Sequence, residues 1–275
     1  MAVGVLIPDI TNPVFPPILL GIEDALREHG YIAILANTGN DLQQISSILS
    51  GLIARQIDGL IFAGLIRNDK TVDECLAQGI AAVAVNRRDE SHRIPAVITD
   101  DERGVHLAVE HLRGLGHRRI GYIAGPQEFS TGLSRRKGFE SAMADLGLPY
   151  APEDIVVAGA YSRPEGQAAT ATLLARGRGL TAIVTGNDLL SLGCYDALRA
   201  AGLECPKDIS VTGFNDMPFV DMVAPPLTTV RISHHQMGAE AARLLVRNME
   251  TNVRASIDIV LKPELVVRGS TAPPR

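Results

Sequence analysis

The stretch ISVTGFNDMPFVDMVAPPLTTV, residues Ile209–Val230, contains a predicted strand, a polar turn and a second extended segment in close succession. The run Val211–Phe214 begins with two β-branched residues, a pattern typical of a strand. Asn215–Pro218 follows at once, and side chains just past the carboxyl end of a strand are where open α/β sheets bind ligands. Pro225-Pro226 stops any helix, so Leu227–Val230 is predicted to be extended.

Strands and helices alternate along the rest of the chain. Glycine stands just past five predicted helices, at Gly30, Gly79, Gly116, Gly147 and Gly202. Glycine takes the left-handed cap conformation without strain, so these residues mark helix ends. Strand–helix–strand alternation predicts parallel sheets with right-handed crossovers, and hence an α/β fold.

The chain is expected to form two lobes with similar sheets, which divide near Gly116-His117. A length of 275 residues is too great for one small core and fits two lobes of ordinary size. No linker rich in glycine and serine marks a boundary. We therefore expect strand-to-strand crossings between the lobes, which would act as a hinge.

Composition excludes several classes of protein. Hydrophobic residues make up 46% and charged residues 21%, which indicates a globular chain. The net charge of −5 argues against a bare DNA-binding module, which should carry a basic face. No apolar run approaches the length of a membrane span, and MAVGVLIPD lacks the features of a signal peptide. Cys75, Cys194 and Cys205 show no CxxC spacing, which favours mostly buried thiols in a reducing cytoplasm.

Catalytic, metal and cofactor signatures are missing from the sequence. There is no GxSxG, HExxH or GxxxxGK pattern, so we predict neither an enzyme nor a cofactor site. Gly177–Ala182 fits GxGxxA, but it follows a helix and opens a strand, the reverse of a dinucleotide fingerprint. His111 and His117, like the pair His234-His235, lack the spacing and acidic partners of a metal site.

What remains is a set of polar and aromatic residues in loops that follow strands. The candidates are Asn12, Phe15, Asn86, Arg87, Asp100, Thr131, Arg135, Tyr161, Asn187 and Asn215. Each also has a structural interpretation, as a cap, a solvated charge or a core ring. Together they favour a polar cleft, since amides, two guanidiniums and one or two rings suit a hydroxylated ligand. Of the adjacent pair Asp100-Asp101, one carboxylate is expected to face ligand and one to cap the next helix.

Several motifs resemble, in order, those of the lactose-repressor (LacI/GalR) family of bacterial transcription regulators. They are IPDITNPVFP near the start, LGHRRIGYIAGP at 115–126, GNDLLSLG at 186–193, SVTGFNDMPF at 210–219, PPLTTV at 225–230 and PELVVRGST at 263–271. The resemblance implies two Rossmann-like lobes joined by three crossovers, the fold of the periplasmic sugar-binding proteins. The lobes would comprise residues 1–116 plus 234–260 and residues 117–233 plus 261–275.

The resemblance also implies a function and assigns roles. It implies a cytoplasmic homodimer that senses a small effector, usually a sugar, sugar derivative or nucleobase, and thereby controls operator DNA. Arg135, three residues before Gly138-Phe139, corresponds to the family's ligand-binding arginine, and Tyr161 to a stacking aromatic. We expect Arg135 to be a cleft residue with little packing to lose. The dimer face is expected to include Asp41–Arg55, although the apolar side of that helix could equally pack on its own sheet.

Two departures from the family affect these expectations. The family's helix-turn-helix, which contacts operator DNA, is absent from this chain. Asn215 stands where many members have aspartate, so the cleft is predicted to be more positive and to tolerate a sugar acid. The alternatives are a periplasmic solute-binding protein, which would share the fold, and an enzyme on a doubly wound scaffold.

Overall fold

The computed structural model describes residues 1–39, 41–67, 69–251 and 257–275, which form two compact units. Met1–Thr99 and Ser233–Leu261 make the first unit, and Asp100–Ile232 and Lys262–Arg275 make the second. The first division therefore falls at Thr99–Asp100 and not near Gly116-His117. The helix that follows it belongs with the second unit because its Gly104 lies against Phe214, so closely that a Cβ at this glycine would stand 2.6 Å from the ring.

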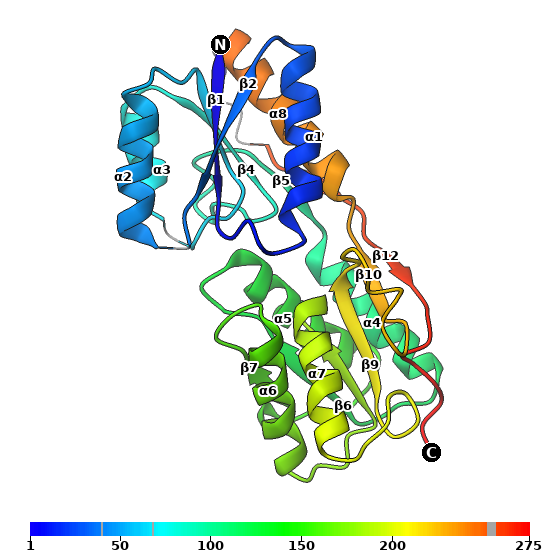
Figure 1. The fold of residues 1–275 in the computed structure, drawn as a ribbon. Helices are drawn as coiled ribbons and strands as arrows, with labels where there is room; N and C mark the ends of the chain where they lie inside the picture. Colours follow the sequence, from blue (N-terminus) through cyan, green and yellow to red (C-terminus); the bar gives the residue numbers. More distant parts are fainter. Residues whose placement is uncertain (40, 68, 252–256) are drawn as a thin grey trace. The chain divides into compact units, whose positions relative to one another are not determined.

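The first unit is built on a six-stranded parallel sheet in the order β11-β5-β4-β3-β1-β2 (Figure 1). Its strands are β1 (Ala2–Ile7), β2 (Ile32–Asn37), β3 (Gly59–Phe62), β4 (Ala81–Val85), β5 (Ala96–Thr99) and β11 (Ile259–Leu261). The central strands are apolar and buried, as expected of a parallel sheet covered on both faces.

Helices cover both faces of this first sheet. Helices α1 (Phe15–Glu28) and α8 (His234–Thr251) pack closely together, since a Cβ at Gly238 would stand 1.9 Å from the carbonyl oxygen of Ile18. Helices α2 (Leu42–Ile53) and α3 (Thr71–Ala77) lie on the other face (Figure 1). The α2 residues Ile45, Leu49 and Leu52 are buried in one hydrophobic cluster with residues of the sheet and α3. The apolar side of α2 thus packs on its own sheet, the alternative that the sequence left open, and a place for this helix in a dimer face stays a prediction.

The second unit repeats the arrangement, with strand order β12-β10-β9-β8-β6-β7. Its strands are β6 (Ile120–Ala124), β7 (Ile155–Val157), β8 (Ala182–Thr185), β9 (Ser210–Asn215), β10 (Thr228–Arg231) and β12 (Glu264–Val266). All are parallel except β12, which pairs antiparallel with β10. Each parallel strand in this sheet therefore ends at the same edge, where its loop begins.

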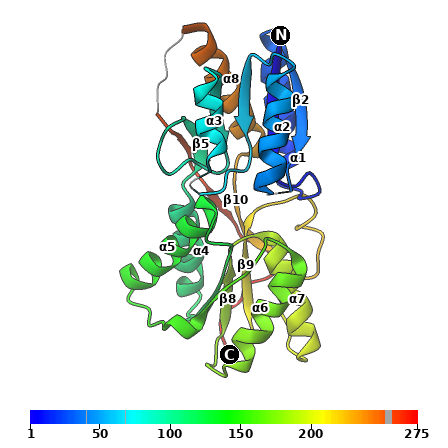
Figure 2. The ribbon, with the colours of Figure 1, turned by 90° about the vertical axis from the view of Figure 1, so that its left-hand side faces the viewer.

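Four helices flank the second sheet. Helices α4 (Asp101–Gly114) and α5 (Ser130–Asp145) cover one face, and α6 (Arg163–Ala175) and α7 (Asp188–Ala200) cover the other (Figure 2). A short 3-10 turn, η1 (Pro152–Asp154), precedes β7. The five glycines predicted to end helices all have positive φ, which confirms them as left-handed caps. In the part of the chain that the structure describes, no helix is long and apolar enough to cross a membrane.

The cysteines lie within these two units as expected. Cys75 and Cys194 are buried and Cys205 is partly buried, which confirms the prediction of mostly buried thiols. Burial raises the pKa of Cys194 and of Cys205 to about 12. Thiols with such high pKa values are poor nucleophiles and poor metal ligands at neutral pH.

Candidate functional site

In the second unit, Thr131 and Tyr161 meet at the strand-end edge of the sheet. Thr131 lies in the first turn of α5, after β6, and Tyr161 follows β7. The Thr131 hydroxyl is 3.4 Å from the phenol oxygen of Tyr161, and the Tyr161 ring stacks on Phe129 at 6.3 Å between centroids. The ring lies directly against Gly125, where a Cβ would stand 2.2 Å from it. The absence of a side chain at Gly125 is thus what makes room for the aromatic ring.

Arg135 is fixed by partners within the second unit. Its Nε donates to Oδ1 of Asp101 at 2.8 Å, and one terminal nitrogen donates to the carbonyl oxygen of Gly186 at 2.7 Å. The guanidinium carbon lies 3.8 Å from the centroid of the Phe214 ring, a cation–π arrangement. Burial acts to lower the pKa of Arg135, but the charge of Asp101 and its hydrogen bond with Arg135, together with Tyr161 and Tyr122, outweigh it and the pKa is raised. Because the side chain is only 3% exposed, the expectation of an arginine with little packing to lose is wrong.

The carboxylates of Asp100 and Asp101 have different roles, as the sequence predicted of this pair. Asp100 is the N-cap of α4, and its Oδ1 accepts from the backbone N–H of Arg103 at 3.0 Å. Asp101 is buried against Arg135. The helix cap is therefore Asp100, the residue that we assigned to the effector, and the buried carboxylate is that of Asp101. Contact between Asp100 and an effector stays a prediction.

Asn187 follows β8, and Asn215 ends the adjacent strand β9 of the second sheet. Asn187 caps α7, and its Oδ1 accepts from the N–H of Leu190 at 2.9 Å. Asn215 ends β9 with φ of +111°, an uncommon conformation for any residue other than glycine. Its side-chain oxygen is buried and accepts no hydrogen bond from the described part of the chain. A buried acceptor without a partner in the chain is uncommon, and it points to a donor from outside the chain, such as a ligand.

Asp188, which the sequence analysis did not single out, directly follows Asn187 and contacts the turn after Asn215. The residue is fully buried; its Oδ1 accepts from the Thr229 hydroxyl at 2.5 Å and its Oδ2 from the N–H of Met217 at 2.8 Å. Burial raises the pKa of Asp188 to about 7, although these two hydrogen bonds act to lower it. The motif GNDLLSLG contains this aspartate, but only the folded chain shows that it is buried.

In the first unit, Asn12 and Phe15 organise the loop after β1. The Asn12 side chain accepts from the N–H of Val14 at 3.2 Å, and the Phe15 ring is 2% exposed. Helix α1 begins at Phe15, so Pro13 precedes the first turn and the expected cap at Asn12 is a turn instead. Asn12 thus shapes the turn and Phe15 is a core ring, as their structural interpretations predicted. Their contact with an effector stays a prediction.

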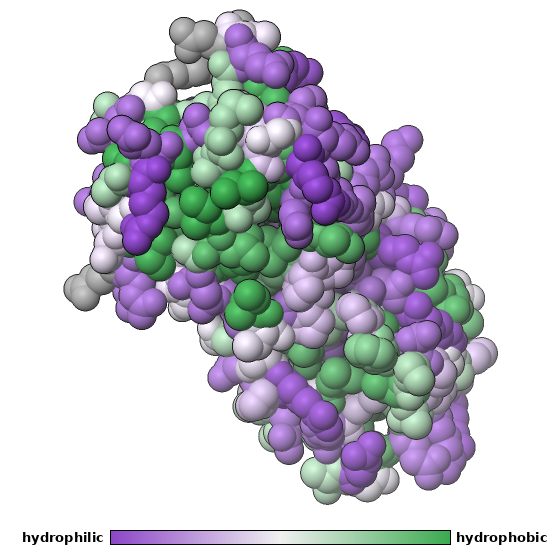
Figure 3. Space-filling view, turned by 45° about the horizontal axis from the view of Figure 1, so that its top comes forward, coloured by the Kyte–Doolittle hydropathy of each residue, from purple (hydrophilic) through white to green (hydrophobic). Residues whose placement is uncertain are grey.

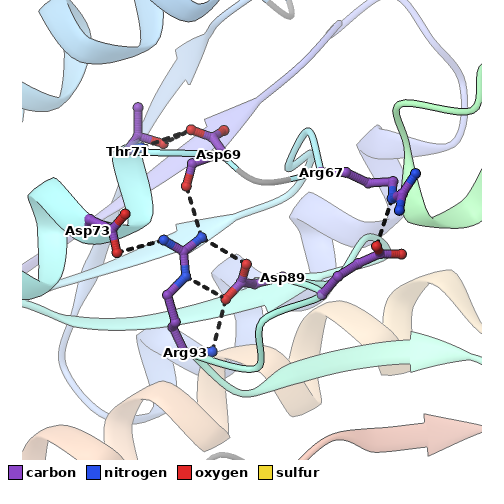
Figure 4. Close-up of polar contacts among 7 residues, drawn as sticks. Arg67, Asp69, Thr71, Asp73, Asp89 and Arg93 are labelled. Carbon is purple, nitrogen blue, oxygen red and sulfur yellow. Dashed lines mark hydrogen bonds and ion pairs between the residues drawn. The ribbon is translucent and has the colours of Figure 1, made fainter.

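Asn86 and Arg87 follow β4 in a loop that is fastened by charged side chains. Asn86 has φ of +68°, and Arg87 is 5% exposed. Further along, Arg93 donates to both carboxylate oxygens of Asp89, at 3.0 and 2.9 Å, and to the carbonyl oxygen of Asp69 at 2.9 Å (Figure 4). Burial acts to raise the pKa of Asp89, but the bonds from Arg93 lower it. The loop that carries Asn86 and Arg87 is therefore held against the segment before α3.

The singled-out histidines have structural partners. His117 is 1% exposed and contacts the Thr181 hydroxyl and the carbonyl oxygen of Ala272, both at 2.9 Å. His111 contacts the Thr271 hydroxyl at 3.0 Å. These contacts attach the carboxy-terminal segment to the second unit. Among the described residues, no three His, Cys, Asp or Glu side chains gather as a metal ion would require.

Comparison with known proteins agrees with this architecture. Residues 109–271 match the family model described as a periplasmic binding protein-like domain. The HTH-type transcriptional regulator MalR of Streptomyces coelicolor is 36% identical over 278 residues, which cover 98% of this chain and 80% of that protein.

Two solved structures are similar over nearly the whole chain. One is the transcriptional regulator CelR in complex with cellobiose, with a TM-score of 0.92, 29% identity and coverage of 98% of this chain and 84% of that chain. The other is a LacI family regulator from Enterococcus faecium with bound ribose, with a TM-score of 0.86, 30% identity and full coverage of both chains. These likenesses favour the effector-binding part of a regulator over a transporter's binding protein. The chain belongs to the LacI family of transcriptional regulators.

Proposed function

We propose that this chain binds a small effector of the sugar class and that the bound effector controls operator DNA binding by the regulator. The observation that carries the proposal is the buried, unpartnered Oδ1 of Asn215 at the end of β9. A sugar hydroxyl is a donor that suits this acceptor, and it can accept in turn from the amide nitrogen. Support also comes from two similar regulators whose solved structures contain cellobiose and ribose.

The aromatic side of the same unit suits a sugar as well. The Tyr161 ring is partly exposed, and it is held against Gly125 and Phe129. An amphipathic ring offers an apolar face to the C–H groups of a sugar and a hydroxyl to its polar edge. We propose that Thr131, Tyr161, Asn187 and Asn215 contact the effector, and that Asn12, Phe15, Asn86, Arg87, Asp100 and Arg135 complete the set.

Charge around these residues favours a neutral sugar over the sugar acid that the sequence suggested. The Arg135 charge is balanced by Asp101 at 2.8 Å. Asp188, fully buried close by, adds negative charge as it ionises. The positive cleft inferred from Asn215 counted on the charges of Arg87 and Arg135, and that of Arg135 is balanced within the second unit. We therefore propose an uncharged polyhydroxylated effector.

A thermal-shift screen tests this proposal with cellobiose, D-ribose and D-gluconate as probes. A ligand present at 100 times its dissociation constant stabilises the folded chain by about 2.7 kcal/mol. Asn215→Gly removes the amide without adding backbone strain, because glycine tolerates positive φ. It should weaken binding of the neutral sugar at least tenfold, whereas Asn248→Ala, on α8, should not. Stabilisation by D-gluconate alone would overturn the neutral assignment.

The exposed edge of the first sheet at β2 is the surface that we propose for a homodimer. Ile32 and Leu35, on this edge strand, are 65% and 49% exposed, and Leu20 on α1 is 54% exposed. Hydrophobic residues gather here between the polar surfaces of α1 and α2 (Figure 3). An exposed, apolar edge strand is otherwise a liability for aggregation, and pairing with a second copy would cover it. Effector binding would then bias an equilibrium between two states of the dimer with different affinity for DNA.

A further inference from the structure

The turn Asn215–Met217 combines backbone strain with a buried anchor. Asn215 has φ of +111° and Asp216 has φ of +54°, two consecutive residues in a region that is strained for residues other than glycine. Such a conformation persists only where surrounding contacts enforce it. The Met217 N–H, directly after the two strained residues, donates to Oδ2 of Asp188 at 2.8 Å.

Asp188 also bonds to the neighbouring strand. Its Oδ1 accepts from the hydroxyl of Thr229 on β10 at 2.5 Å, and both residues are fully buried. Gly213 on β9 leaves space for this carboxyl, since a Cβ there would stand 2.3 Å from Oδ1. One carboxyl, at the start of α7, therefore joins β10 to the turn after β9.

We propose that Asp188 is a positioning residue, which holds the turn Asn215–Met217 in the strained conformation that presents Asn215 to the effector. The link to the effector rests on the proposed function; the hold on the turn does not. A second set of contacts acts on the same turn, because the Asp216 carboxylate pairs with Arg231 and with Arg268, both at 2.7 Å. Asp188 differs from Arg231, whose side chain is 48% exposed, in being fully buried.

The first experiment needs no ligand. Backbone amide exchange of Met217 is measured by NMR in the wild type, Asp188→Ala, Asp188→Asn and Thr229→Val. Asp188→Ala should accelerate Met217 exchange at least tenfold relative to core amides of β8. Asp188→Asn should keep most of the protection, because its oxygen can accept from Met217 while its nitrogen donates to Thr229 Oγ1. Thr229→Val should give an intermediate increase.

Thr170→Val is the matched control for Thr229→Val. Thr170 is also fully buried in the second unit, and its hydroxyl donates to the carbonyl oxygen of Gly166 at 2.7 Å, within α6. The two substitutions remove the same hydroxyl from equally buried places, but only one of the hydroxyls contacts Asp188. If Met217 exchanges no faster in Thr229→Val and Asp188→Ala than in Thr170→Val, the positioning role is wrong.

The second experiment measures affinity for cellobiose and D-ribose by calorimetry. Thr229→Val should weaken the affinity for whichever sugar binds the wild type by about tenfold. Thr229→Ser should restore this affinity, and Thr170→Val should leave it unchanged. Unchanged affinity in Thr229→Val, despite faster Met217 exchange, would overturn the link between Asp188 and the effector. If neither sugar binds the wild type, the sugar proposal fails in this form, while Met217 exchange still decides whether Asp188 holds the turn.

Discussion

Arg135 on α5 donates from Nε to Oδ1 of Asp101, the first residue of α4, at 2.8 Å, and both side chains are buried. Asp101 lies two residues after Thr99, where the chain passes from the first unit to the second. The residue that the family resemblance assigns to effector binding is therefore also part of the internal structure of the second unit. Its substitution should affect stability as well as binding.

Arg135→Ala is expected to lower the free energy of unfolding by about 3–5 kcal/mol, since it leaves the Asp101 carboxylate buried without its partner. Urea unfolding provides the measurement. Arg163→Ala is the control, because Arg163 pairs with Asp196 at the surface with its side chain 57% exposed, and such pairs contribute about 0–1 kcal/mol. Equal losses in the two variants would contradict a buried ion pair at Arg135.

Stability should depend on pH through Asp188, whose folded-state pKa of about 7 lies above the value of about 3.9 expected in the unfolded chain. The folded state binds the extra proton between these values, so this contribution is present at low pH and is lost as pH rises through 7. Relative to Asp188→Asn, the wild type should lose about 3 kcal/mol between pH 5 and pH 8.

Urea unfolding of both proteins at the two pH values measures the Asp188 effect. Asp89, whose pKa is lowered, acts in the opposite direction, but it is present in both proteins and cancels. Asp145→Asn, at a side chain 63% exposed, should keep the pH dependence of the wild type. A parallel pH dependence in Asp188→Asn and the wild type would show that Asp188 does not titrate in this range.

Gly125→Ala should displace the Tyr161 ring, because the new Cβ would stand 2.2 Å from ring atoms. We expect a loss of about 1–3 kcal/mol in unfolding free energy and weaker binding of whichever sugar the thermal-shift screen finds. Gly114→Ala is the matched control, since Gly114 ends α4 with open space around it, and alanine there should be neutral or stabilising by up to about 1 kcal/mol. Normal sugar affinity in Gly125→Ala would remove Tyr161 from the proposed contacts.

Leu35→Lys on β2 should convert the proposed homodimer into a monomer, because it places a charge in the apolar face of the edge strand. Light scattering at micromolar concentration should give about twice 29.3 kDa for the wild type and 29.3 kDa for the variant. Val157→Lys is the control, since Val157 is 45% exposed on β7, an edge strand of the second sheet. A monomeric wild type, or equal effects of the two substitutions, would exclude this face.

The sequence by itself determined the fold class, because the information is local and repeated. Runs such as Val211–Phe214, polar strand ends and glycines at helix ends specify strand, loop and helix within a few residues of the chain. The motif order then identified the family, and the glycine caps and buried thiols are confirmed. The placement of Thr131, Tyr161, Asn187 and Asn215 at or after the carboxyl ends of strands also follows from this periodicity.

Tertiary structure alone decided what each of these side chains touches. Asp101 and Arg135 are 34 residues apart and Asp188 and Thr229 are 41 apart, and no local pattern records such pairings. The sequence predicted Arg135 as a charge in the cleft, whereas the folded chain buries it in an ion pair with Asp101. Burial also raises the pKa of Asp188 to about 7. Tertiary packing also places α4 in the second unit and buries the apolar face of α2 in the core of the first unit. The hydrophobic periodicity of a helix shows that one of its faces is apolar, but only tertiary packing determines which surface covers that face.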